Sequence, residues 1–198
     1  MEFLEDGPAD SARTLILAHG AGGAMDSELM NVVAGGIAAG GVRVLRFEFP
    51  YMRARRADGK SRAPDREAVL LESWREAIRE CGSDRPYIGG KSMGGRMASM
   101  VADEMRVAGL ICLGYPFHPP GRPERLRTAH LGPLKSRALI VQGTKDAFGT
   151  RDDVAGYELS SSIDFHWIEG GNHDLRASGK KKAECWAEVT ETVLTFIS

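Results

Sequence analysis

The stretch that most constrains this chain runs from Ile88 to Met97 and reads IGGKSMGGRM. It contains Ser92, which has a glycine two positions before it and another two positions after it. The residues before this stretch are few and apolar, as expected at the end of a buried strand. After it, apolar residues recur at the spacing of one helix face: Met93, Met97, Met100 and Val101. The stretch therefore predicts a strand, a sharp turn at Ser92 and a helix.

The glycines of this turn have a chemical reason. A tight strand-to-helix turn exposes a serine hydroxyl, but it imposes strained backbone angles on that serine. Gly90 and Gly94 leave room where a side chain would collide with the neighbouring strand or helix. The helix N-terminus also directs backbone N–H groups at the site, which suits a developing oxyanion. The pattern favours Ser92 as a nucleophile, and the alternative is an ordinary glycine-rich turn.

Composition and charge argue against several classes of function. A formal net charge of -1 over 198 residues argues against binding to nucleic acid or to an anionic membrane. No apolar run approaches the ~20 residues of a membrane span, and the N-terminus lacks a signal-peptide core. The chain has no metal or nucleotide motif, so we expect no metal and no cofactor. A reduced, cytoplasmic setting with buried free thiols is expected from three cysteines: Cys81, Cys112 and Cys185.

Short apolar runs alternate with helical patterns along the whole chain. Strands are expected at residues 14–18, 42–47, 86–89, 107–113, 138–142 and 163–168. Helices are expected at about residues 25–40, 65–82, 93–101, 124–131, 151–159 and 180–197. A polar loop is expected from Pro50 to about Pro64, with Asp65 as the next helix N-cap. The repetition predicts a single domain over residues 1–198, a three-layer α/β/α sandwich with a mostly parallel sheet of about six strands.

Candidate functional residues follow the strands of this predicted sheet. In such sheets ligands bind beyond the carboxyl ends of the strands. Ser92, Asp146 and His173 each follow a different strand, in that chain order. A glycine-rich loop, His19 to Gly23, follows the first strand. A serine, a carboxylate and a histidine in this order are typical of an α/β-hydrolase.

On these residues the chain resembles a compact α/β-hydrolase of the dienelactone-hydrolase-like kind. Gly89–Arg96 and His19–Gly22 resemble a small group of uncapped members, which includes bacterial proteins and homologues of a chromatin acetyltransferase complex subunit. The resemblance covers about Thr14 to Ile197. The chain departs from the larger hydrolases because it lacks their extra N-terminal strands and a large lid.

The resemblance implies roles for three side chains. Ser92 would be the nucleophile and His173 the general base, while Asp146 would orient the imidazole and stabilise the imidazolium. Asp152 and Asp153 are competing carboxylates that lie further past the same strand.

The resemblance also implies an oxyanion hole built from backbone N–H groups. Met93 would supply one donor and Ala21 the second, with Gly22 as the substitute for Ala21. His19 is expected to fix this loop by hydrogen bonding rather than to react.

The expected activity is hydrolysis of a small ester or thioester through an acyl-enzyme, by a serine hydrolase of the esterase kind. Its partner would be that small-molecule substrate. Peptidase and acyltransferase activities remain open, because one triad serves several acyl transfers. The alternative from another class is an α/β-hydrolase-like protein-interaction module with little or no turnover.

Other charged side chains allow two interpretations each. The arginines that follow the second strand favour an anionic substrate or acidic partner, or else form a solvated loop. Lys91 either lowers the pKa of a neighbouring group or is simply exposed. His166 is expected to be structural, and His130 to be solvated at the end of a helix. The arginines concerned are Arg53, Arg55, Arg56 and Arg62.

Overall fold

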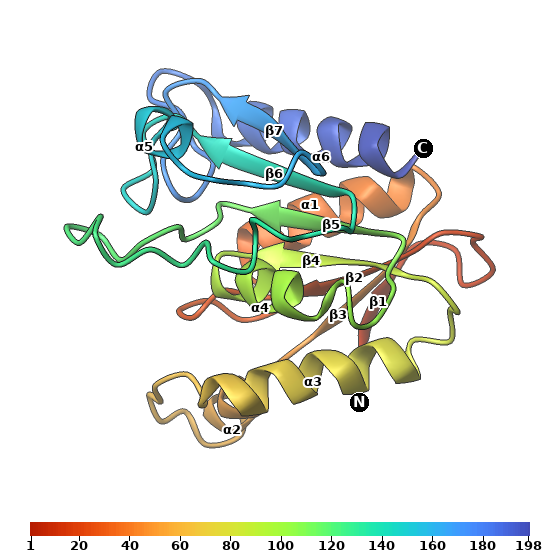
Figure 1. The fold of residues 1–198 in the computed structure, drawn as a ribbon. Coiled ribbons are helices and arrows are strands. Elements are labelled where there is room, and N and C mark those ends of the chain that lie inside the picture. The colour runs from red at the N-terminus through yellow and green to blue at the C-terminus, as the bar shows by residue number, and fades with distance from the viewer.

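A computed structural model describes residues 1–198, and its centre is a seven-stranded sheet in the order β1-β3-β2-β4-β5-β6-β7 (Figure 1). Every neighbouring pair of strands is parallel except β1 with β3. The strands are β1 (Leu4–Asp6), β2 (Thr14–Ala18), β3 (Arg43–Phe47), β4 (Tyr87–Lys91), β5 (Gly109–Leu113), β6 (Ala138–Gly143) and β7 (Ile163–Ile168).

Helices cover both faces of this sheet (Figure 1). Leu15 and Leu17 of β2 belong to the apolar core beneath α1 and α6. Ile16 and Ala18 belong to the opposite core, beneath α3 and α4, because successive strand side chains point to opposite faces. The helices are α1 (Glu28–Ala39), α2 (Pro50–Asp58), α3 (Glu67–Glu80), α4 (Met93–Val101), α5 (Arg151–Ala155) and α6 (Lys182–Ile197).

This arrangement confirms the predicted fold class, a three-layer α/β/α sandwich with a mostly parallel sheet. The sheet has seven strands rather than about six, because the short β1 pairs antiparallel with β3 at the edge. The connection from β5 to β6 contains turns and no helix, so the helix expected at residues 124–131 is wrong. The backbone of that stretch bonds outside any helical pattern, because the Arg127 N–H donates to the Phe117 carbonyl (2.8 Å). Gly132 and Pro133 follow directly and end the stretch.

The loop expected after residue 50 is also wrong, because α2 occupies most of it. Pro50 stands in the first turn of α2, where a missing N–H costs nothing, and Gly59 ends the helix with a φ of 71°. Asp65 does not cap α3, whose N-cap is Arg66. Its carboxylate instead accepts a hydrogen bond from the Tyr51 N–H at the start of α2 (2.8 Å).

Three further features complete the fold. The helix expected at residues 151–159 is the short α5, which ends at Gly156. No helix of the structure combines the length and the apolar character that crossing a membrane requires. All three cysteines are buried free thiols, as expected from their sequence positions.

Candidate active site

Ser92 occupies a strained turn between β4 and α4. Its backbone has φ 52° and ψ −116°, a conformation that side chains other than glycine rarely adopt. A Cβ at Gly90 would clash with the Ala18 carbonyl oxygen, and one at Gly94 would lie 2.6 Å from the His19 carbonyl oxygen. Both glycines are therefore required because β4 and α4 pass directly against the end of β2.

Ser92, His173 and Asp146 come from three separate loops and meet at the carboxyl end of the sheet. The Ser92 hydroxyl and His173 Nε2 are 2.8 Å apart, and His173 Nδ1 donates to Asp146 Oδ2 at 2.8 Å. Because a carboxylate only accepts hydrogen bonds, Nδ1 carries the proton and Nε2 is free to accept one from Ser92. Phe148 stacks on the His173 ring with centroids 4.1 Å apart, which restricts how the ring can turn.

Asp146 is fully buried and held by donors other than His173. The Phe148 N–H donates to its Oδ1 at 2.9 Å, and the Gln142 side chain donates to its Oδ2 at 2.9 Å. The competing carboxylate Asp153 caps the N-terminus of α5 through Thr150 instead. The structure thus places Asp146, and not Asp153, behind His173.

Gln142 is a site residue that the sequence analysis missed. Its carboxamide oxygen accepts the Tyr115 N–H (2.7 Å), and its nitrogen contacts Asp146, the Tyr115 carbonyl and the Gly149 carbonyl. It therefore ties the end of β5 to the loop that carries the carboxylate. A signal was present in the sequence, because Gln142 is the one polar side chain in the otherwise apolar run of β6.

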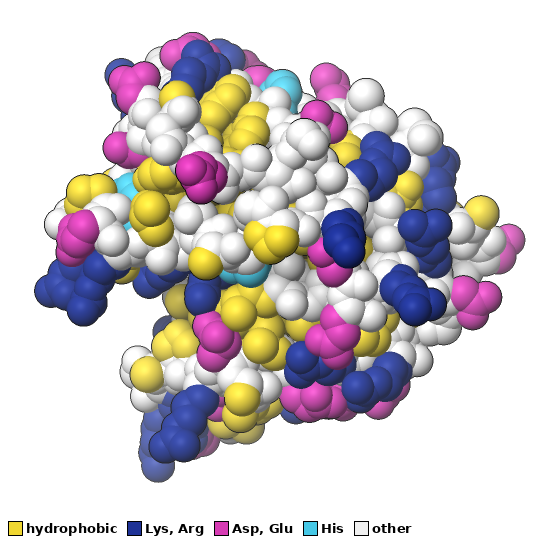
Figure 2. Space-filling model, in the orientation of Figure 1, with side chains coloured by type: hydrophobic (Ala, Val, Ile, Leu, Met, Phe, Trp, Pro, Cys, Tyr) yellow, Lys and Arg dark blue, Asp and Glu magenta, His cyan; other side chains and the backbone are white.

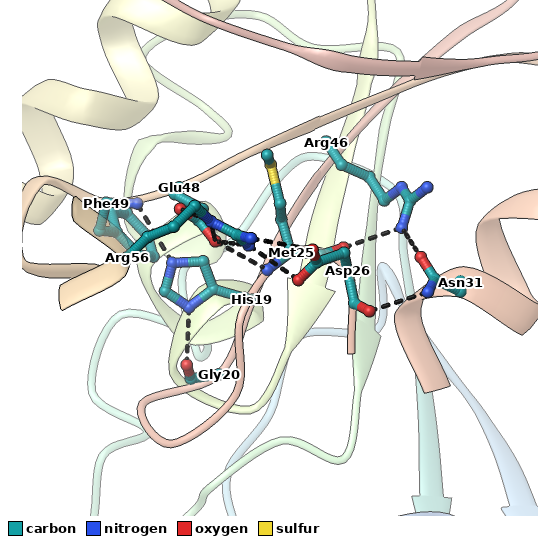
Figure 3. Close-up of polar contacts among 9 residues, drawn as sticks. All are labelled: His19, Gly20, Met25, Asp26, Asn31, Arg46, Glu48, Phe49 and Arg56. Carbon is teal, nitrogen blue, oxygen red and sulfur yellow. Dashed lines mark hydrogen bonds and ion pairs between the residues drawn. The ribbon is translucent and has the colours of Figure 1, made fainter. Parts of the chain in front are cut away.

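His19 holds the glycine-rich loop, as expected (Figure 3). Its Nδ1 donates to the Gly20 carbonyl (2.7 Å), and its Nε2 accepts the Phe49 N–H (3.2 Å). Burial lowers the pKa of His19, which favours the neutral ring that this donor–acceptor pattern needs. The Tyr51 hydroxyl donates to the Ala21 carbonyl at 3.0 Å. The loop carbonyls are thus directed toward His19 and Tyr51.

The orientation of these carbonyls determines where the loop N–H groups point. In a trans peptide the N–H points opposite to the C=O, so the Ala21 N–H is directed away from His19. That N–H has no acceptor within the protein. A Cβ on Gly20 would lie 3.5 Å from Ser92 Cβ, so this loop passes directly beside the serine. The Met93 N–H opens α4, where the first N–H groups lack intrahelical partners.

An ion-pair cluster around the buried Glu48 fixes the segment that follows the glycine-rich loop (Figure 3). Arg56 of α2 pairs with Glu48 Oε1 (2.6 Å) and with Asp26 Oδ1 (2.8 Å). Only 2% of the Glu48 side chain is exposed, and the Met25 N–H also donates to it (3.4 Å). Hydrogen bonding from Arg56 lowers the pKa of Asp26.

Two of the four arginines in this stretch therefore form ion pairs within the protein. Arg56 joins α2 to Asp26 and to Glu48, and Arg62 pairs with Asp58 at 2.6 Å. The stretch is largely helical rather than a mobile loop, and these two arginines are not available to bind an anionic substrate.

Lys91 is buried beside Ser92 rather than exposed. Its Nζ lies 4.0 Å from Asp174 Oδ1, and 11% of its side chain is accessible. Burial lowers the pKa of Lys91 to about 8, against the opposing effect of Asp174 and Asp146.

His130 and His166 lie outside the site. The expectation that His130 is solvated is wrong. Its Nε2 contacts the Ser99 hydroxyl (2.8 Å) and the Tyr115 hydroxyl (3.2 Å). His166 of β7 contacts Glu188 of α6 at 3.1 Å, in agreement with its expected structural role.

Two pockets meet at Ser92, and Ala21 and Phe148 line both of them. The first, called here the His173-side pocket, has a volume of about 530 Å³. The second, the α4-side pocket, has a volume of about 400 Å³ and lacks His173. No group of three His, Cys, Asp or Glu side chains is arranged to hold a metal ion. The His173-side pocket includes Lys91, Asp174, Arg176, Lys182 and Trp186; the α4-side pocket includes Leu70, Met93, Arg96, Met97, Pro116 and Arg127.

A doubly wound parallel sheet with a serine on a strained strand-to-helix turn defines the α/β-hydrolase class of folds. Comparison with known sequences agrees, since residues 11–198 match the family described as alpha/beta hydrolase domain. The chain belongs to this family.

Solved structures share the fold. An alpha-beta serine hydrolase homologue from Coxiella burnetii is 22% identical, with a TM-score of 0.70 over 98% of this chain and 87% of that one. Est1E from Butyrivibrio proteoclasticus, with ferulic acid bound, is 16% identical, with a TM-score of 0.75 over 99% and 94%. A serine hydrolase without lid from Xanthomonas campestris is 16% identical, with a TM-score of 0.69 over 98% and 88%. At these identities the likeness establishes the fold alone.

Proposed function

We propose that this protein is a serine hydrolase that cleaves a small ester or thioester through an acyl-enzyme, and that residues 1–198 act as one catalytic domain. The proposal rests on one observation, the hydrogen-bonded chain from Ser92 through His173 to the buried carboxylate of Asp146. This chain supplies what a serine nucleophile needs, a base within reach and a group that orients the base. The esterase and hydrolase structures with the same fold support the same reaction class.

In the proposed reaction, Ser92 Oγ attacks the substrate carbonyl carbon while His173 Nε2 takes the hydroxyl proton. Negative charge develops on the carbonyl oxygen, where the N–H groups of Ala21 and Met93 stabilise it. His173 then gives its proton to the leaving group, whose bond to the acyl carbon breaks. A water molecule, deprotonated by His173, attacks the acyl carbon and releases the acid. Asp146 stabilises the imidazolium in both halves of the reaction.

The test is covalent labelling with a fluorophosphonate, which reacts with activated serines. We expect labelling of the wild-type protein and none of Ser92→Ala. Ser99→Ala is the matched control, because Ser99 also lies 2.8 Å from a histidine but on the interior of α4. Absence of labelling in folded wild-type protein would refute the proposal and favour an interaction module without turnover.

A further inference from the structure

The α4-side pocket contains an arginine, Arg127, that the fold leaves without an ion-pair partner. Arg96 and Arg127 both line it, together with the acids Asp65 and Glu67. Glu67 pairs with Arg96 at 2.9 Å, and the Asp65 carboxylate accepts the Tyr51 N–H. Glu67 therefore offsets the charge of Arg96, whereas Asp65 accepts only a neutral N–H and the Arg127 guanidinium forms no ion pair. Burial and the charge of Arg96 lower the pKa of Arg127.

A second observation concerns a donor of the neighbouring arginine, Arg96. Arg96 Nε is buried and has no hydrogen-bond partner. A buried unpartnered donor costs about 1–3 kcal/mol, so folds rarely leave one without a reason. An anion entering the pocket would pair with Arg127 and offset the repulsion that Arg96 exerts on it. A carboxylate suits the position because its two oxygens match the planar fork of a guanidinium.

The position of His173 decides which part of a substrate would reach these arginines. If Ser92 and His173 act as proposed above, His173 protonates the leaving group, which must therefore lie in the His173-side pocket. The acyl group then extends the other way, into the α4-side pocket, which Ser92 and Met93 also line. Figure 2 shows the molecule hollowed between the β5–β6 connection and the α2–α3 region, where this pocket opens.

The spacing along α4 limits the length of the acyl group. Arg96 follows Ser92 by four positions, and its N–H donates to the Ser92 carbonyl at 2.9 Å, as in one helical turn. One turn rises about 5.4 Å, which a chain of about five carbons can span. Apolar side chains of Leu70, Met97 and Pro116 line the same pocket.

We propose that the α4-side pocket binds the terminal carboxylate of a dicarboxylic acyl group through Arg96 and Arg127, so that the preferred substrates are half-esters of short diacids. This inference rests on the proposed hydrolase function and names its substrate class. The sequence analysis had considered the arginines that follow the second predicted strand for binding an anionic substrate. The proposal assigns that role to one arginine of α4 and one of the β5–β6 connection.

The test compares kcat/KM for two nitrophenyl esters that differ in charge, p-nitrophenyl hydrogen glutarate and p-nitrophenyl pentanoate. A charge-assisted hydrogen bond predicts at least a tenfold preference for the glutarate half-ester in the wild type. Arg127→Gln should reduce this ratio to near one, and Arg127→Lys should retain part of it, since the charge remains without the fork. Arg125→Gln is the matched control, because Arg125 is exposed on the same connection and does not line the pocket.

A ratio near one in the wild type, or one that Arg127→Gln leaves unchanged, overturns the subsite. If pentanoate is still hydrolysed in a Ser92-dependent manner, the hydrolase function survives that result. A binding experiment tests the subsite independently of ester turnover. Monomethyl glutarate titrated calorimetrically into Ser92→Ala should bind, and the added Arg127→Gln change should weaken binding at least tenfold. Binding of this kind without any ester turnover would support the subsite and refute the proposed reaction.

Discussion

Two serine–histidine pairs lie on the same strand-to-helix unit, and their separations are equal. Ser92 Oγ and His173 Nε2 are 2.8 Å apart, and so are Ser99 Oγ and His130 Nε2. Beyond that distance the pairs differ. His173 has the carboxylate of Asp146 at its second nitrogen, whereas no carboxylate contacts His130.

The serine–histidine hydrogen bond runs in opposite directions in the two pairs. Ser99 Oγ donates its hydrogen to the Arg96 carbonyl (2.7 Å), so His130 Nε2 must be the donor to Ser99. Burial and the charge of Arg96 also lower the pKa of His130, which opposes its taking up a further proton. At Ser92 the hydroxyl is left to donate to His173. A short distance therefore does not make a nucleophile; the third group and the direction of donation do.

The largest expected effect is the difference in kcat between variants of the two serines. Ser92→Ala should lower kcat for a nitrophenyl ester by about 10⁶, the cost of losing the nucleophile in a triad. Ser99→Ala should keep kcat within about twofold, because Ser99 bonds to the Arg96 carbonyl and to His130 and lines neither pocket at Ser92. Steady-state kinetics on purified, folded variants provide the measurement. Comparable losses in both variants would break the distinction between the pairs.

The next effect concerns the carboxylate that only one pair possesses. Asp146→Asn should lower kcat by about 10⁴, because the amide favours the wrong imidazole tautomer. Asp153→Asn should alter stability by about 1 kcal/mol through the cap of α5, with kcat retained. The measurement is kcat together with urea unfolding for both variants. Full activity in Asp146→Asn would mean that another acid serves His173.

A smaller effect is expected at Gln142, which positions the carboxylate without touching substrate. Gln142→Leu removes a hydrogen bond to a charged group, worth about 1.5–3 kcal/mol, so kcat should fall at least tenfold. KM should change little, because Gln142 lines neither pocket. Rates should be normalised to the fraction of sites that fluorophosphonate titrates. If the variant has fewer titratable sites but a normal kcat per site, Gln142 supports folding and does not position the carboxylate.

The smallest effect is a pH dependence of stability that comes from His130. Its pKa in the folded protein lies below the ordinary value of 6.5, so the unfolded chain binds protons more readily. The free energy of unfolding should therefore be highest above that value and should fall as the pH falls below it. Urea unfolding of wild type and His130→Gln between about pH 8 and pH 5 measures this slope. The variant should show a shallower decline, although His19 contributes in the same direction. Equal slopes would mean that His130 titrates normally.

Much of the site could be predicted because local rules govern it. The turn at Ser92 needs glycines on both sides, since a Cβ would meet the Ala18 carbonyl or the His19 carbonyl. Asp146 and His173 follow parallel strands, and the carboxyl ends of such strands share one edge. Their meeting with Ser92 follows from topology.

Other features were missed because no local pattern encodes them. β1 has three residues, none of them buried, and it exists because β3 offers an unpaired edge. α2 is largely polar, and it is held by the packing of Tyr51 and Met52 and by the pairing of Arg56 with Glu48. Periodicity cannot detect a helix whose stability comes from contacts distant in sequence.

The sequence by itself determined the fold class, the turn at Ser92 and the loops that carry the histidine and the carboxylate, because strand and helix periods and glycine sterics are local. Only the tertiary structure showed that a second serine, Ser99, also lies within hydrogen-bond distance of a histidine, but of one that no carboxylate contacts. Only the tertiary structure showed, too, that Arg56 is neutralised while Arg127 is not. The reason is physical: charge neutralisation and hydrogen-bond direction depend on side chains that meet across the fold, and sequence spacing does not record those meetings.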